Sequence, residues 1–313
     1  MVERGTATRV SVAVLIRLLL VILTFVLIVV LSQVALVSAR TRLERADLPT
    51  IAQQAWDGTS DYFTSLASGS LGEATSTSIL GGERRAMGTL LLDAYTKSMV
   101  LVLLAVGLAA LFGILIGVLA AASRRARVRA ALLTITTLAV SLPSFLLAIL
   151  LIVGGAELTA RYGVRLWPTF GFGFDDHLIV PVLVLAARPF AQIATFAYVA
   201  TEDVLGLDYI RTARAKGLAE SVILARHALG NAAVPIIGAV AGGLSIALST
   251  LPVVEVFFSW PGLGFALLQA VRRFDAATAG TLLGALAVTI ALVRFGLDAL
   301  AGHFARRATG TTA

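Results

Sequence analysis

Six long apolar stretches set the strongest constraint on how this chain folds. Each is at least about 20 residues long, which is the length that an α-helix needs to cross the hydrocarbon core of a bilayer. They lie near residues 14–36, 98–122, 131–153, 178–199, 233–256 and 280–300. Hydrophobic residues make up 58% of the 313 positions and charged residues only 14%, which is more apolar surface than one globular core buries. The sequence therefore predicts an all-α integral membrane bundle of six transmembrane helices.

The first apolar stretch has a second interpretation as a cleaved signal peptide. Arg4, Arg9 and Arg17 precede its apolar core, and Val37-Ser38-Ala39 resembles a cleavage site. The apolar run from Leu18 to Val37 has 20 residues, however, and is longer than the usual core of a signal peptide. We therefore interpret this stretch as an uncleaved signal anchor.

The distribution of basic residues predicts the orientation in the membrane. The connections 123–130 and 201–231, together with the two ends of the chain, carry 13 basic residues, whereas the connections 154–177 and 257–279 carry four. Because cytoplasmic loops hold the excess of Lys and Arg, both termini are expected in the cytoplasm. The net charge of +7 is assigned to this topology and not to nucleic-acid binding, because only two of the basic residues are lysines and the arginines lie between apolar segments.

The polar connection between the fourth and fifth stretches predicts a cytoplasmic helix–turn–helix. Gly217 gives the backbone the freedom to reverse, and residues 220–231 are expected to form a second helix that continues into the fifth span. Two interpretations remain open on physical grounds: an ordinary basic loop, and a surface on which a soluble partner docks. An apolar stripe at helical spacing before the turn consists of Val204, Leu207, Ile210 and Ala213.

Motifs for nucleotide hydrolysis and covalent chemistry are missing from the sequence. There is no GxxxxGK[ST] phosphate loop, no HExxH and no GxSxG, the chain has no cysteine, and its three histidines lie in separate connections or tails. We therefore expect no catalytic residue, no metal site and no cofactor bound by this chain. An energised role requires a separate motor subunit. An autonomous ion-coupled transporter is the contrasting interpretation, but acids and histidines inside the spans, which it favours, are scarce.

Four runs of sequence, in a fixed order along the chain, resemble a known family. They are Ser68-Gly69-Ser70-Leu71-Gly72, Leu142-Pro143-Ser144-Phe145, Asp208-Tyr209-Ile210-Arg211-Thr212-Ala213-Arg214-Ala215-Lys216-Gly217 (continued by Arg226-His227-Ala228-Leu229, Asn231-Ala232 and Pro235) and Ser259-Trp260-Pro261-Gly262-Leu263-Gly264. The third run resembles the EAA-type coupling loop of permease subunits of ATP-binding cassette (ABC) importers. Over roughly residues 10–305 the chain is similar to the first permease subunit of the dipeptide/oligopeptide/nickel family.

Three positions depart from the family pattern. Arg211 stands where the general EAA motif begins with Glu, which suits the peptide/nickel branch and argues against a sugar or phosphate permease. Gly230 replaces a proline of many permeases. Arg188 replaces an apolar residue that often precedes the proline of the fourth span.

The resemblance implies partners, location and cargo. It implies a second homologous permease subunit, two cytoplasmic ATP-binding subunits that use ATP and Mg, and an extracytoplasmic substrate-binding protein, in and around the bacterial cytoplasmic membrane. The implied cargo is short peptides (di- and oligopeptides), with nickel or another small solute as the alternative. The residues implied to couple the permease to its motor are Asp208, Tyr209, Arg211, Thr212, Ala213, Arg214, Ala215, Lys216, Gly217 and Leu218.

Three further residues are candidates for the translocation path or a gate. Arg188 and Pro189 lie within the fourth span, where a charged side chain costs about 2.5–3.5 kcal/mol or more to insert and so should face protein or water. Arg188 either lines the path, where it suits a peptide carboxylate, or locks the bundle through an interhelical hydrogen bond, which we slightly favour. Glu255 is either part of an outer gate, a contact with the binding protein, or an acid at the membrane interface. Trp167 and Trp260 fit aromatic anchors at that interface.

These expectations divide the chain into four parts. Residues 1–37 form the N-terminal tail and first transmembrane helix, and residues 38–97 form an extracytoplasmic region that packs as a small cap. Residues 98–303 form a five-helix permease core that includes the coupling loop at 201–233. Residues 304–313 are a cytoplasmic tail.

Overall fold

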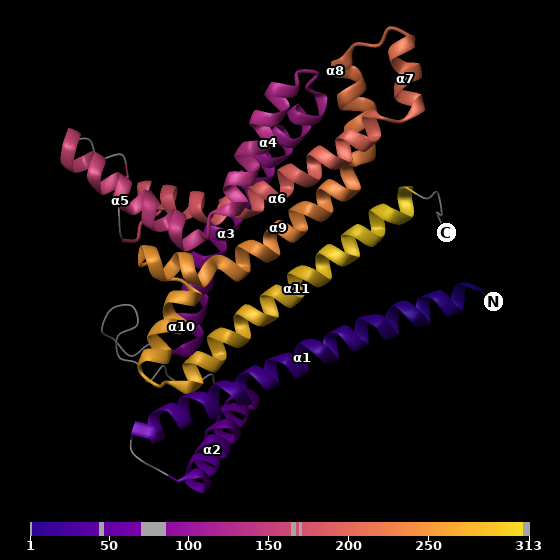
Figure 1. Ribbon diagram of the computed structural model, residues 1–313. Helices are drawn as coiled ribbons and strands as arrows, with labels where there is room; N and C mark the ends of the chain where they lie inside the picture. The colour runs from indigo at the N-terminus through magenta and orange to yellow at the C-terminus, as the bar shows by residue number, and fades with distance from the viewer. Residues whose placement is uncertain (1, 44–46, 70–85, 164–166, 169–170, 309–313) are drawn as a thin grey trace. The chain divides into compact units, whose positions relative to one another are not determined.

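A computed structural model of the chain describes residues 2–43, 47–69, 86–163, 167–168 and 171–308. Within these ranges the side chains from residue 15 to residue 296 are placed, apart from 17 and 42–43. The regular elements of the described part are helices joined by turns (Figure 1). The predicted all-α class is therefore confirmed.

Six helical segments of the described ranges are long and apolar enough to cross a bilayer, which is the number predicted. They lie in α1 (Val2–Leu43), α3 (Met87–Ala122), α5 (Ser144–Tyr162), α6 (Ile179–Leu205, preceded by the 3₁₀ turn η1, Asp176–Leu178), α9 (Leu229–Phe258) and α11 (Ala276–Ala308).

The third predicted span, at 131–153, is wrong as a continuous helix. The structure breaks it into α4 (Ala126–Ser141) and α5 at the pair Leu142–Pro143 (Figure 1). Pro143 has no N–H to donate, and its ring pushes the preceding residue out of the helical region, so Leu142 adopts an extended ψ of 121°. The apolar segment that meets the length criterion is α5, which begins after this break.

The region after the first span contains more helix than the sequence indicated. Residues Leu48–Ala67 form α2, which packs on α1, where Gln33 Nε2 donates to the carbonyl oxygen of Gly58 at 3.4 Å. The second span also begins earlier than predicted, at Met87. Of the run Ser68–Gly72, only Ser68 and Gly69 belong to the described residues.

The chain divides into two compact units. The first comprises Met1–Ser98 and Pro261–Phe295. In it, the hydroxyl of Ser98 accepts from Leu263 N at 2.8 Å and so satisfies a free N–H at the start of α10 (Leu263–Arg272). The core of this unit includes Met87, Leu90, Ala94, Leu263, Ala266 and Leu282.

The second unit, Met99–Trp260 with Gly296–Ala313, is built around α6 and α9. These two helices run antiparallel along their length (Figure 1). Glycines of α3 permit a close approach to α6: a β-carbon on Gly113 would lie 3.0 Å from the carbonyl oxygen of Phe190, and one on Gly117 would collide with the carbonyl oxygen of Ala194. The Gly113–Gly117 pair is therefore a packing motif, as the GxxxG spacing predicts. Small residues meet where α6 approaches α9 and the segment before it, η2 (Ile223–Ala228): Ala197, Ala200, Ala228 and Ala232.

Candidate functional site

The predicted helix–turn–helix lies at one end of the second unit (Figure 1). Its first arm is α7 (Asp208–Ala215), and its second arm is α8 (Glu220–Val222), followed by the π-helical segment η2 (Ile223–Ala228) and then by α9. Ile210 and Ala213 of the first arm are buried against Ile223 of the second. The two arms therefore share a small apolar core, which holds the hairpin together.

The predicted apolar stripe is wrong at one position, Leu207. This side chain is 48% exposed. Helix α6 ends at Leu205, and Leu207 has an extended ψ of 151° before α7 begins, so the helical register is interrupted between Val204 and Ile210. Gly206 lies at this interruption, and it is the residue from which the end of the helix could have been predicted.

The turn after α7 requires the glycine that the sequence places there. Gly217 has a φ of +80°, in the left-handed region. Its N–H donates to the carbonyl oxygen of Arg214 at 3.0 Å, and Leu218 N donates to the carbonyl oxygen of Ala213 at 3.3 Å. This pair of bonds is the Schellman motif, which ends helices at a left-handed residue. The prediction that Gly217 makes the reversal is confirmed.

Ion pairs brace the two arms of the hairpin. Arg214 Nη2 lies 2.7 Å from Glu220 Oε1, and Arg214 Nε also donates to this carboxylate, at 3.2 Å to Oε1. This charged partner raises the pKa of Arg214 further above its already high value. Arg124, at the α3–α4 connection, places its Nη2 3.7 Å from Glu220 Oε2. Because these ion pairs are exposed, each contributes at most about 1 kcal/mol to the stability of the fold. Their main effect is to fix the geometry of the hairpin.

Further contacts join α7 to α9, and α4 to α6, at this end of the unit. Asn231, in the first turn of α9, donates through Nδ2 to Tyr209 Oη at 2.8 Å and to the carbonyl oxygen of His227 at 2.9 Å, which ties α7 to the start of α9. Arg129 Nη1 lies 3.5 Å from Glu202 Oε1, which ties the start of α4 to the end of α6. Movement of α7 would therefore be passed to α9 through the Tyr209–Asn231 bond.

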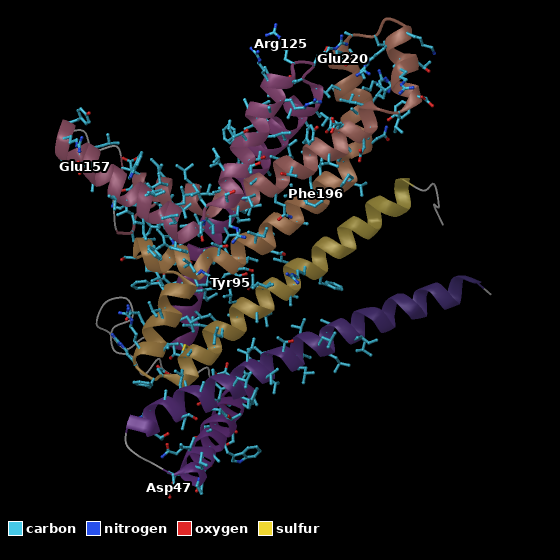
Figure 2. All side chains as sticks on the ribbon, in the orientation of Figure 1. Asp47, Tyr95, Arg125, Glu157, Phe196 and Glu220 are labelled. Atoms are coloured by element: carbon cyan, nitrogen blue, oxygen red, sulfur yellow. The ribbon has the colours of Figure 1, made fainter. Side chains whose placement is uncertain are left out.

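Most of the predicted coupling side chains are exposed on the hairpin. Asp208 and Arg211 form an exposed pair at 3.3 Å. Ala213 is the exception, because its side chain is buried in the hairpin core. Arg125 lies at the same end of the unit as Glu220 (Figure 2). The exposed members of the predicted set are Asp208, Tyr209, Arg211, Thr212, Arg214, Ala215, Lys216, Gly217 and Leu218.

Arg188 lies near the middle of the apolar helical segment Asp176–Leu205, and its side chain is exposed. It forms no hydrogen bond or ion pair with any residue in the described ranges. The interhelical hydrogen bond that we favoured from the sequence does not form among the described residues and stays a prediction. Pro189, next to it, is buried and packs against Gly243 of α9, where an added β-carbon would lie 3.3 Å from Pro189 Cβ.

Glu255 and Trp260, near the end of α9, are both fully buried. An acid at the membrane interface would keep its carboxylate in water, so that interpretation of Glu255 is wrong. Trp260 meets Phe172 edge-on at 4.8 Å between ring centroids and Phe174 at 6.0 Å. It is therefore part of an aromatic cluster and not an interface anchor. Trp167 is half-buried and packs on Gly155.

Within the described residues, no three His, Cys, Asp or Glu side chains gather closely enough to bind a metal ion. The described residues offer instead an exposed hairpin at one end of two long packed helices, and within one of these helices an arginine that has no ionic partner among the described residues.

Comparison with known proteins identifies the family. The profile of the family described as "Binding-protein-dependent transport system inner membrane component" matches residues 113–310. The chain belongs to this family. The match contains the hairpin and both helices α6 and α9, and it confirms the predicted resemblance to ABC importer permeases. This permease is accordingly a multi-pass membrane component of a transport system.

Relatives within the family agree with this identification. The permease is 31% identical over 265 residues to a di/tripeptide transport system permease of Pseudomonas aeruginosa (strain UCBPP-PA14), covering 77% of each chain. It is 33% identical to a dipeptide transport system permease of Bacillus subtilis (strain 168), over 55% of this chain and 54% of the relative. It is 37% identical to a glutathione transport system permease of Escherichia coli (strain K12), over 53% of each chain.

A solved structure agrees with the fold. An amino acid ABC transporter crystallised with histidines aligns with a TM-score of 0.53 over 70% of the permease and 94% of that chain, at 16% sequence identity. At this identity the likeness supports the helical architecture alone.

Proposed function

We propose that this permease forms one half of the translocation pathway of an ATP-driven importer of short peptides. The cargo class is inferred from the similarity to a di/tripeptide permease, which extends over 77% of both chains. The glutathione permease among the relatives also handles a small peptide. Arg211 at the start of the coupling motif fits the same branch.

In this proposal the permease works in a larger assembly. A second homologous permease completes the pathway, two ATP-binding subunits dock from the cytoplasm and use ATP and Mg, and a binding protein delivers substrate from outside. Both termini lie in the cytoplasm, by the excess of basic residues on that side. The functional division follows the spans: 1–37, an extracytoplasmic region at 38–97, the core at 98–303 with its coupling loop at 201–233, and a cytoplasmic tail at 304–313.

The hairpin transmits the work of the motor. The exposed face of α7 enters a groove of an ATP-binding subunit, as a short helix does when it docks on a partner. Closure of the motor then displaces α7, and the Arg214–Glu220 pair, the Schellman turn and the Asn231–Tyr209 bond carry this displacement to α9. The helices rock from an inward-facing to an outward-facing arrangement.

Arg188, Pro189 and Glu255 belong to the path in this proposal. Arg188 supports this role because it is exposed and has no ionic partner in the described part of the chain. Pro189 interrupts the hydrogen bonding of α6 beside it and offers a site at which the helix can bend. Glu255, buried near the end of α9, contributes to an outer gate.

Uptake by the reconstituted complex tests the proposal. The permease is co-expressed with the subunits encoded beside it, purified, and placed in proteoliposomes with ATP inside and the binding protein outside. We expect ATP-dependent accumulation of a labelled dipeptide, and none when this chain is omitted. Accumulation of nickel in place of the dipeptide, or uptake by this chain alone without ATP, would contradict the proposal.

A further inference from the structure

Arg188, which has no partner among the described residues, is part of a polar strip that runs along two neighbouring membrane helices. Gln192 follows one turn later on α6, and its amide nitrogen lies against Gly242 of α9, where an added β-carbon would collide with it. Because α6 and α9 run antiparallel, Arg188 falls at the level of residues one turn after Gly242, which are Ser245 and Ile246. Arg188 is exposed and Gln192 is half-exposed.

The face of α9 beside Arg188 is also small and polar. Gly242, Ser245 and Ser249 are spaced by three and four residues and therefore share one side of the helix. Gly242 and Ser245 are half-exposed, and Ser249 is exposed. The hydroxyl of Ser249 donates to the carbonyl oxygen of Ser245 at 2.8 Å. The hydroxyl of Ser245 and the amide of Gln192 form no hydrogen bond with residues in the described ranges.

This strip does not suit contact with lipid. A guanidinium in hydrocarbon without a partner costs about 2.5–3.5 kcal/mol or more, and the side-chain amide beside it adds to that cost. Many other exposed side chains on the membrane helices are large and apolar, such as Leu183 and Phe196 of α6 (Phe196 is labelled in Figure 2). The strip therefore faces either water and a solute, or a polar group of another chain.

We propose that Arg188, Gln192 and Ser245 form a transient binding site for the terminal carboxylate of the transported peptide. A guanidinium binds a carboxylate through paired, charge-assisted hydrogen bonds. The Gln192 amide and the Ser245 hydroxyl add neutral donors, and Gly242 leaves room for the peptide backbone to approach. The site rests on the proposed peptide transport and adds to it a basis for selecting anionic ends within the membrane.

The test compares a dipeptide with its C-terminal amide, in which the carboxylate is absent. Uptake of alanyl-alanine and of alanyl-alanine amide is measured in proteoliposomes that contain the complete transporter, with wild-type permease, Arg188→Gln, Arg188→Lys and Gln192→Ala. Arg161→Gln, which changes an exposed arginine at the end of α5 away from the strip, is the matched control. The binding protein is the same in every sample. Its own preference between the two substrates therefore cancels when the ratio of dipeptide uptake to amide uptake is compared between a variant and the wild type.

We expect Arg188→Gln to lower dipeptide uptake about tenfold relative to amide uptake, which is the effect of losing a charge-assisted hydrogen bond. Arg188→Lys should restore part of the preference, and Gln192→Ala should reduce it to a smaller extent. Equal loss of both substrates at a normal protein level would overturn the inference and would indicate that Arg188 meets an acid of the second permease. An absence of dipeptide uptake with the wild-type chain would instead refute the proposed function itself.

A second readout does not depend on uptake of the amide. Because the chain has no cysteine, Ser245→Cys gives a single thiol on the strip. During ATP turnover, alanyl-alanine should slow labelling of this thiol by a water-soluble thiol reagent, and this protection should disappear with Arg188→Gln. Protection that is equal in both backgrounds would contradict a role for Arg188 in holding the carboxylate.

Discussion

Substitution of Gly217 tests whether the hairpin turn is part of the coupling machinery. The residue sits at a φ of +80°, and no atom lies within 4 Å of the place where a β-carbon would be added. Gly217→Ala therefore meets no collision, and its whole cost is the left-handed backbone, about 1–2 kcal/mol. A cost of this size lowers the population of the native turn by a factor of about 5–30.

Three variants separate the backbone from the surface. Gly217→Asn keeps a residue that tolerates the left-handed conformation, so we expect it to retain more uptake than Gly217→Ala. Gly217→Trp adds a large side chain on the exposed turn and should abolish coupled uptake by blocking the motor. Membrane insertion should be normal in all three, because the turn lies outside the apolar spans.

The assay is ATP-driven dipeptide uptake in proteoliposomes, normalised to the amount of inserted permease. The expected order of uptake is wild type, Gly217→Asn, Gly217→Ala, Gly217→Trp. Equal uptake by the Ala and Asn variants would show that the left-handed turn does not limit coupling. Full transport by Gly217→Trp would remove the assignment of this turn to the motor-docking surface.

Further predictions concern packing and charge. Gly117→Leu drives a side chain into the backbone of α6 and should sharply lower the yield of folded protein in detergent, whereas Gly107→Leu, which has open space around it, should not. Trp260→Ala removes a fully buried indole, and thermal unfolding should show a loss of about 3–5 kcal/mol; an unchanged Tm would contradict the buried cluster. Glu220→Gln removes the ion pair with Arg214 at a cost below about 1 kcal/mol, so the protein level should stay constant. Uptake per hydrolysed ATP should fall, because this pair joins the two arms of the hairpin.

Sequence reasoning succeeded where one physical rule dominates. The number of spans follows from the thickness of the bilayer, and Gly217 follows from the need for a left-handed residue at a helix reversal. The break at Leu142–Pro143 follows from an equally general rule, that the residue before a proline disfavours the helical conformation. This break was missed because apolar residues continue on both sides of the proline.

Other features depend on neighbours that are distant in sequence. The burial of Trp260 involves Phe172 and Phe174, which no local pattern connects to it. The exposure of Arg188 depends on how α6 is rotated against α9, and hydropathy does not specify that rotation. The partners of Glu220 come from two different connections, Arg124 in one and Arg214 in the other.

The central claim is that α7 docks on a separate ATP-binding subunit. Arg211→Cys introduces the only thiol of the chain on the exposed face of α7, and Trp56→Cys, at an exposed position of α2, gives a matched control. In the active complex, the first variant should form a cross-link with the ATP-binding subunit, at a rate that changes when ATP binds, and the control should form none. If the thiol at position 211 fails to cross-link to that subunit in any nucleotide state of an actively transporting complex, the account is contradicted.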